Sequence, residues 1–163
     1  MAAVLHGAHT GFEYWLYLEA PINENDEGPL ALWTAAQPEG PFARRAYVLD
    51  GRAGRWDAGR FSESRVVHFG GLFHLFATGS AVGLPRPDKL VEQLGWAVSA
   101  DGVRFTEHPA NPLVPVAATT PHTLAMSEGH AWMDPGSPAV YVYPTVLFFW
   151  GSSVCLRLHL FYV

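Results

Sequence analysis

The feature that most constrains this chain is an internal repeat of about 60 residues. The aromatic segments YWLYLEA and FHLFATG begin at Tyr14 and Phe73, which are 59 residues apart. A second pair of matching segments ends at Phe42 and Phe105, 63 residues apart, and two Ser-Glu dipeptides are separated by 65 residues. Self-similarity at nearly one spacing indicates that the same supersecondary unit recurs along the chain.

Each repeat has the pattern of short strands joined by tight turns. In the second repeat we expect strands at 65–68, 72–76 and around 96–98, with a glycine turn at Gly70-Gly71 between the first two. A further turn is expected at Ser99-Ala100-Asp101-Gly102, because Asp-Gly between strands is a strong hairpin signal. Asp101 is therefore expected to be structural. Four short strands per repeat is the number found in a β-propeller blade.

The predicted fold is all-β, a single partial β-propeller of about two and a half to three blades. The approximate repeats are 1–55, 56–120 and 121–163, with an atypical end of the chain. A β-sandwich is the alternative, since any all-β chain with regular turns could form one.

Composition agrees with strands and excludes several kinds of partner. The 163 residues include 16 Gly and 13 Pro, and the net charge is −5. An acidic chain without a basic face does not suit nucleic acid. The single cysteine, Cys155, cannot form an internal disulfide and is expected to be a buried apolar residue. The first residues lack the pattern of a signal peptide, so the default expectation is a cytoplasmic protein.

The segment 139–163 is almost wholly apolar. A membrane helix needs roughly 20 uninterrupted apolar residues, whereas Pro144 and the turn Gly151-Ser152-Ser153 interrupt this segment. Residues 154–160 alternate in the manner of a strand. We therefore expect strands here and no membrane partner, with a membrane segment as the minor alternative.

Three segments carry a resemblance to a known family. They are WDAGRFSESRVVHFGGLFHLF from Trp56, GWAVSADGVRFTEHPANPL from Gly95 and SEGHAW from Ser127. Together they resemble the five-bladed β-propeller glycoside hydrolases of the arabinanase, levansucrase and invertase type, especially glycoside hydrolase family 43. The resemblance spans roughly residues 14–132. It implies an incomplete five-bladed propeller, a carbohydrate substrate and hydrolysis of arabinosyl or xylosyl bonds.

The resemblance also implies which carboxylates are catalytic. Glu128, in Ser127-Glu128-Gly129-His130, matches the family's general acid in an E-G-P-H-like segment, although no proline follows Gly129 here. Glu63 holds the corresponding place one blade earlier, where the family usually has an aspartate that orients and tunes the acid. Glycoside hydrolysis needs two carboxyl groups, one to protonate the leaving oxygen and one on the other face of the sugar. For Glu63, a solvent-facing ion pair with Arg60 or Arg65 remains the alternative.

Five further residues are candidates for substrate binding: Asp57, Arg65, His130, Trp132 and Trp56. The alternatives are a turn cap for Asp57, a salt bridge for Arg65, core packing for the tryptophans and orientation of Glu128 for His130. Trp15, Trp33 and Trp96 are assigned to the core. The histidines His6, His68, His74, His122 and His130 show no metal-ligand spacing, so no metal and no cofactor is expected.

Aligning the inner strands of the repeats places the family's water-activating aspartate at or just before Met1. We therefore expect a fragment that is inactive as an isolated chain. The alternative is a non-catalytic propeller module that binds carbohydrate or protein. An open propeller exposes a strand edge, which predicts self-association.

Overall fold

The computed structural model describes residues 3–11, 13–20, 28–51, 55–80, 92–113, 123–133, 140–150, 153–158 and 161–162. Side chains are described up to residue 113, with the exception of residues 3, 60 and 62. Within these ranges the chain forms three four-stranded antiparallel sheets, which we call blades 1, 2 and 3. The one helix of the described ranges is the short 3-10 helix η1 (Ala8–Thr10).

Each blade is a run of consecutive strands. Blade 1 contains β1 (Ala3–Leu5), β2 (Tyr14–Glu19), β3 (Leu30–Ala35) and β4 (Ala43–Leu49). Blade 2 contains β5 (Arg60–Phe69), β6 (Leu72–Ser80), β7 (Gln93–Ser99) and β8 (Thr106–Glu107). Blade 3 contains β9 (Thr123–Met133), β10 (Val140–Trp150), β11 (Ser153–Leu158) and β12 (Phe161–Tyr162).

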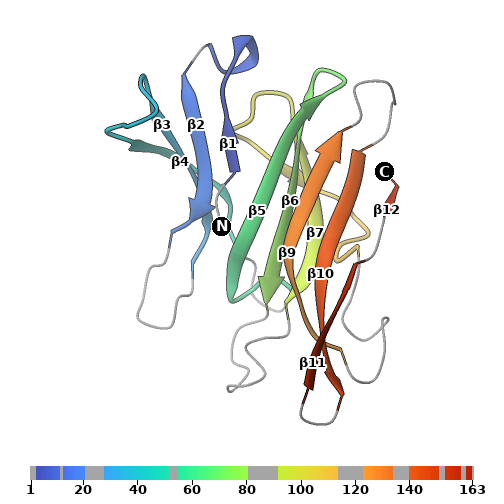
Figure 1. Cartoon of the computed structure of the whole chain (residues 1–163). Coiled ribbons are helices and arrows are strands. Elements are labelled where there is room, and N and C mark those ends of the chain that lie inside the picture. The colour runs from blue at the N-terminus through green and yellow to red at the C-terminus, as the bar shows by residue number, and fades with distance from the viewer. Residues whose placement is uncertain are drawn as a thin grey trace.

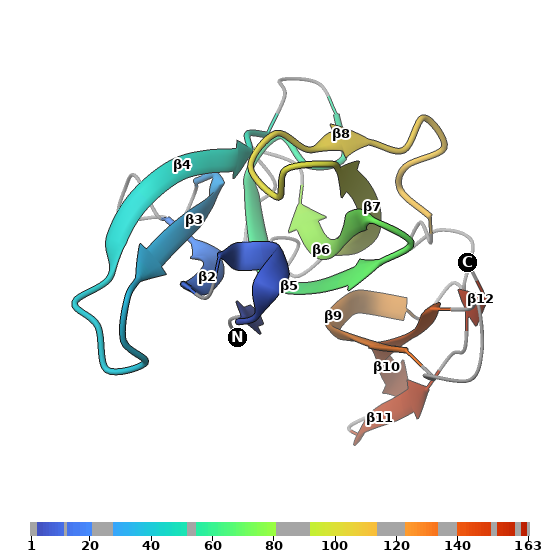
Figure 2. The same ribbon diagram turned by 90° about the horizontal axis from the view of Figure 1, so that it is seen from above.

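The blades are arranged as part of a propeller. Seen from above, the first strands β1, β5 and β9 lie next to one another and the later strands of each blade extend outward from them (Figure 2). Figure 1 shows β5 and β9 side by side along much of their length. The prediction of an incomplete all-β propeller is confirmed.

The aromatic strands lie where the repeat predicts them. Tyr14 begins β2, and Phe73 is the second residue of β6. The predicted inner strand at 65–68 is longer than expected, since β5 begins at Arg60. It gains this length through a bulge, which period-two alternation does not reveal.

The core lies between blades 1 and 2. Trp15 and Tyr17 of β2 alternate inward and meet Phe73 of β6, with the rings of Trp15 and Phe73 stacked at 5.7 Å. The fully buried Tyr17 donates its hydroxyl proton to the carbonyl oxygen of Gly102 at 2.8 Å. Burial raises the pKa of Tyr17, so the hydroxyl stays protonated and keeps this bond. Trp15 is therefore a core residue, as predicted.

The turn that meets Tyr17 is held by Asp101. Its carboxylate accepts the backbone N–H groups of Val103 and Arg104, and the Ser99 hydroxyl, at 2.8–2.9 Å. These backbone hydrogen bonds hold the pKa of Asp101 well below its usual range. Gly102 has φ +69°, and a Cβ there would press into Trp15 and Tyr17. The predicted structural role of Asp101 is confirmed.

The apolar C-terminal segment forms strands in its described part. β10 passes through Pro144, and β11 pairs with it from Ser153 to Leu158. No helix in the described ranges is both long and apolar enough to cross a membrane.

Candidate functional site

The inner strands β5 and β9 share a feature at their predicted catalytic residues. On β5, residues 62 and 63 together oppose the single residue Thr78, because Phe61 pairs with Gly79 and Ser64 with Ala77. On β9, residues 128 and 129 together oppose Pro144. Both are β-bulges, which redirect a side chain and are frequent beside active sites. The two glutamates of the repeated Ser-Glu pair therefore each lie in a bulge of an inner strand.

Glu63 and Arg65 flank Ser64 in β5. Ser64 and Val66 face blade 1, since Ser64 donates to the carbonyl of Tyr17 at 3.3 Å and Val66 belongs to the core. Successive side chains of a strand alternate between its two faces. Arg65, which follows Ser64 in the regularly paired part of β5, therefore points away from blade 1, toward the side of β5 on which β9 lies (Figure 2). Glu63 and Arg65 are both partly exposed.

The remaining predicted residues of the inner site lie on β9. In the register with β10, His130 pairs with Tyr143 and Trp132 pairs with Tyr141. Glu128 follows Ser127, which pairs with Thr145. The side chains of Glu128, His130 and Trp132 are outside the described part of the structure. Their strand is the neighbour of β5, so the backbone brings Glu63 and Glu128 onto adjacent inner strands.

Trp56 and Asp57 precede β5, and Trp56 packs against the core between blades 1 and 2. The indole of Trp56 packs over Gly79 and Gly95, where any Cβ would collide with it, and it meets Phe61 edge-on at 6.2 Å. Asp57 is fully buried, 3.8 Å from the Arg55 guanidinium, in the turn in which Ala58 N–H bonds the Arg55 carbonyl. These surroundings favour the structural alternatives of core packing and a turn, and substrate contact remains an untested prediction.

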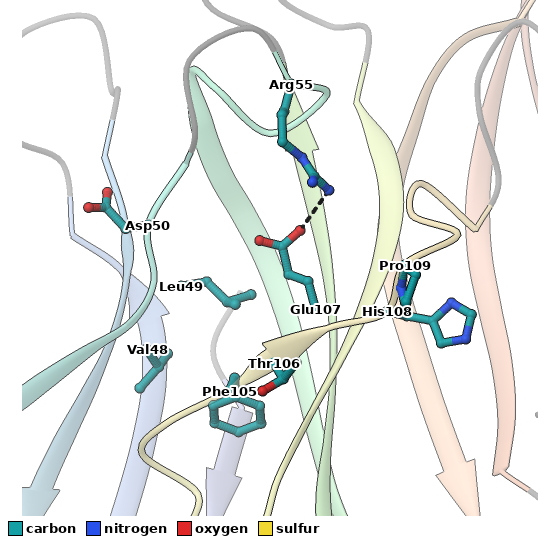
Figure 3. A pocket seen from close by; sticks show the side chains of 9 residues that line it. All are labelled: Val48, Leu49, Asp50, Arg55, Phe105, Thr106, Glu107, His108 and Pro109. Atoms are coloured by element: carbon teal, nitrogen blue, oxygen red, sulfur yellow. Dashed lines mark hydrogen bonds and ion pairs between the residues drawn. The ribbon is translucent and has the colours of Figure 1, made fainter.

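A groove at the outer strands escaped prediction. It has a volume of about 510 Å³ and lies between β4 and β8, lined by Val48, Leu49, Asp50, Arg55, Phe105, Thr106, Glu107, His108 and Pro109 (Figure 3). Arg55 donates to Glu107 across it at 3.3 Å. The two residues are 52 positions apart, so no local motif announces the pair. The groove lies on the outer strands, whereas both glutamate bulges are on inner strands.

A second unpredicted cluster joins blades 1 and 2 at the end of β5 away from Glu63. The imidazoles of His9, from η1, and His68, from β5, stack at 4.7 Å with only 5° between their planes. Phe73 lies 4.7 Å from His68 and 5.9 Å from His9. Burial lowers the pKa of His9, and the neighbouring His68 and His6 lower it further. The sequence gives no signal for His9, because this residue falls in a loop between repeat strands.

The described residues offer no ready metal ligands. No three His, Cys, Asp or Glu side chains among them are grouped so as to hold an ion. His122 lies outside the described residues. The expectation of no metal and no cofactor stays a prediction.

Known structures share this architecture. A family 117 glycoside hydrolase from the marine bacterium Zobellia galactanivorans matches with a TM-score of 0.61 at 18% identity, over 96% of this chain and 44% of that chain. An alpha-L-arabinofuranosidase from Lactobacillus brevis matches with a TM-score of 0.63 at 9% identity, over 89% of this chain and 43% of that one. A thermostable family-43 glycoside hydrolase matches with a TM-score of 0.61 at 17% identity, over 88% of this chain and 40% of that chain.

No family model and no curated protein matches the chain in sequence. The chain spans less than half the length of each of these three proteins. It therefore has a glycoside hydrolase-like fold, that of part of a five-bladed β-propeller.

Proposed function

We propose that this chain is the part of a glycoside hydrolase propeller that carries the general acid, Glu128, and its supporting carboxylate, Glu63. The substrate class is arabinosyl or xylosyl linkages. The observation that supports this most is the pair of bulges, one at each glutamate, on adjacent inner strands. A merely solvent-facing glutamate has no need of a bulge, yet Glu63 is the second residue of its bulge and Glu128 is the first residue of its own.

The chemistry follows from where acidic residues occur. The inner strands β1, β5 and β9 carry two acidic residues, Glu63 and Glu128. An inverting hydrolase separates its acid and base by roughly 6.5–9.5 Å so that a water fits between base and sugar. If Glu128 is the acid and Glu63 tunes it, the water-activating carboxylate is absent from these three strands. A missing base costs about 10²–10⁴-fold in rate.

This assignment predicts that the 163-residue chain binds arabino-oligosaccharides but does not hydrolyse glycosidic bonds. Hydrolysis of 4-methylumbelliferyl arabinofuranoside and xyloside by the chain should not exceed the rate without protein. Saturation-transfer NMR should detect weak binding of arabino-oligosaccharides, reduced in Glu63→Gln and in Glu128→Gln. Glu39→Gln is the matched control, because Glu39 is an exposed carboxylate outside the strands.

Two results would count against the proposal. Hydrolysis by the isolated chain that survives Glu128→Gln would show that the acid is misassigned. Binding that falls equally in the Glu39→Gln control would show that the effect is one of net charge and not of the inner strands.

A further inference from the structure

The two bulges of the inner strands lie opposite different residues. On β9 the residue opposite the bulge is Pro144, which has no N–H group for the ladder, and prolines within sheets are found at edges and bulges. On β5 the opposite residue is Thr78, which has an N–H group, is fully buried and pairs with Leu94 on its other side. Thr78 therefore does not by itself require the bulge that contains Glu63.

Blade 1 holds both ends of the β5 bulge. Just before it, the backbone N–H of Phe61 donates to the carbonyl oxygen of Gly28, two residues before β3, at 3.2 Å. Just after it, the hydroxyl of Ser64 donates to the carbonyl oxygen of Tyr17 at 3.3 Å. Since β2 and β5 lie side by side, these bonds join neighbouring blades (Figure 2). The backbone of residues 62–63 is therefore tied to blade 1 at both ends.

Both of these attachments are closed to water. Phe61 and Ser64 are each 1% exposed, and Tyr17 is fully buried. A buried polar group that loses its hydrogen-bond partner stays unsatisfied, because water does not reach it. Removal of the Ser64 hydroxyl would therefore detach this end of the bulge, with no solvent molecule to take its place.

We propose that Ser64 is the positioning residue of Glu63: its hydroxyl holds the bulge on blade 1 and thereby sets the direction of the Glu63 carboxylate. A bulge interrupts the alternation that otherwise assigns a side chain to one face of a strand, so this direction depends on how the bulge is attached. The proposal rests on the function proposed above, in which Glu63 supports the general acid. Such a group must be held within roughly 0.5 Å of its working position.

The internal repeat shows that this attachment is particular to β5. Glu63 corresponds to Glu128, so Ser64 corresponds to Gly129. The place beside Glu128 thus carries no hydroxyl, and its bulge has Pro144 opposite it instead. We therefore expect removal of the Ser64 hydroxyl to affect Glu63 and to leave β9 unchanged.

The first test measures the conformation of Glu63 by NMR of the isotopically labelled full chain. The Hα–Hβ coupling constants of Glu63 should indicate one χ1 rotamer in the wild type and an average over rotamers in Ser64→Ala. Tyr17→Phe is the matched control. It also removes one buried hydroxyl that donates to a backbone carbonyl, at Gly102 and not at the bulge, and it keeps the carbonyl that accepts from Ser64. Its Glu63 couplings should equal those of the wild type.

The second test is a double-mutant cycle on the binding of arabinobiose, measured by NMR titration. Ser64→Ala should weaken binding by roughly fivefold in the wild-type background and by no further factor in Glu63→Gln, because a positioning residue acts only through the carboxylate that it holds. A purely structural role would weaken binding by the same factor in both backgrounds. Circular dichroism of Ser64→Ala should match the wild type, since the substitution removes a single oxygen atom.

Rotamer averaging of Glu63 in the wild type itself would overturn the proposal. So would couplings that Ser64→Ala leaves unchanged, couplings that Tyr17→Phe changes equally, or a loss of binding that is the same with and without Glu63. A wild type that binds no arabinobiose would contradict the proposed function instead, and the couplings of Glu63 would still decide the role of Ser64.

Discussion

The two faces of blade 1 are built from alternate residues of the same strands, and only one of them is covered within the described chain. Trp15 and Tyr17 face blade 2 and are buried, whereas Leu16 and Leu18 face the other way and are half-exposed. Both sets are apolar. The difference lies in the neighbouring sheet, which shows that burial in this molecule is decided between blades and not by the hydrophobicity of single residues.

A pair of leucine truncations gives the largest expected contrast between the two faces. Leu32 is fully buried against blade 2, and Leu32→Ala should lower the free energy of unfolding by about 2–5 kcal/mol, as buried leucines usually do. Leu16→Ala removes the same atoms from the half-exposed face that points away from blade 2 and should cost about 1 kcal/mol. Urea unfolding measures both values. Equal losses of stability would mean that the face of blade 1 that points away from blade 2 is as well packed as the core.

The loss of one hydroxyl group should separate the faces by a smaller amount. Tyr17→Phe leaves the buried carbonyl oxygen of Gly102 without its donor, at a cost of about 1–3 kcal/mol. Tyr47→Phe also removes a hydrogen bond, to Arg44, but at an exposed site, so we expect a change within about 0.5 kcal/mol. Thermal unfolding of both variants checks the difference. A larger loss of stability in Tyr47→Phe than in Tyr17→Phe would contradict this expectation.

Whether a structural feature could be predicted from the sequence depends on how far apart in the chain its interacting residues are. The Ser99–Gly102 turn and the strands at Tyr14 and Phe73 follow from local signals, and they lie where predicted. The bulges do not, because a bulge is a property of the register between two strands. Arg55 and Glu107 likewise meet only through the pairing of distant segments.

The candidate site also has some features that follow from local sequence and others that depend on strand register. The Ser-Glu repeat identifies Glu63 and Glu128 as equivalent positions, and the structure adds that each lies in a bulge of an inner strand. Trp56 illustrates the opposite case. Nothing local announces that Gly79 and Gly95 leave room for its indole, since those glycines belong to two other strands. Only the folded register distinguishes a packed tryptophan from one that could contact a sugar.

The smallest expected effect concerns the histidine junction and pH. The pKa of His9 is lower in the folded chain than the ordinary value of 6.5, so the unfolded chain binds more protons. Stability should therefore be complete above pH 6.5 and decline as pH falls below it. The neighbouring His68 and His6 lower the pKa of His9 further, and His74, whose pKa burial also lowers, contributes in the same direction.

His9→Asn should flatten this decline without abolishing it, because His74 remains. Melting temperatures of the wild type and the variant between pH 5 and pH 8 measure the effect, with His108→Asn as a control. His108 stacks on Trp96 at 4.9 Å and does not belong to the stacked pair. A wild-type decline that His9→Asn leaves unchanged, or a stability that rises as pH falls, would show that the stacked pair does not titrate as described.

The central claim is that ligand chemistry belongs to the inner strands and not to the outer groove. The most direct measurement is a titration of the ¹⁵N-labelled chain with arabinobiose, followed by amide chemical shifts. We expect shifts to concentrate at residues 62–65 of β5 and 127–130 of β9, while residues 105–108 at the outer groove stay unchanged. Shifts confined to 105–108, or no shift at any residue up to tens of millimolar ligand, would contradict the assignment of Glu63 and Glu128.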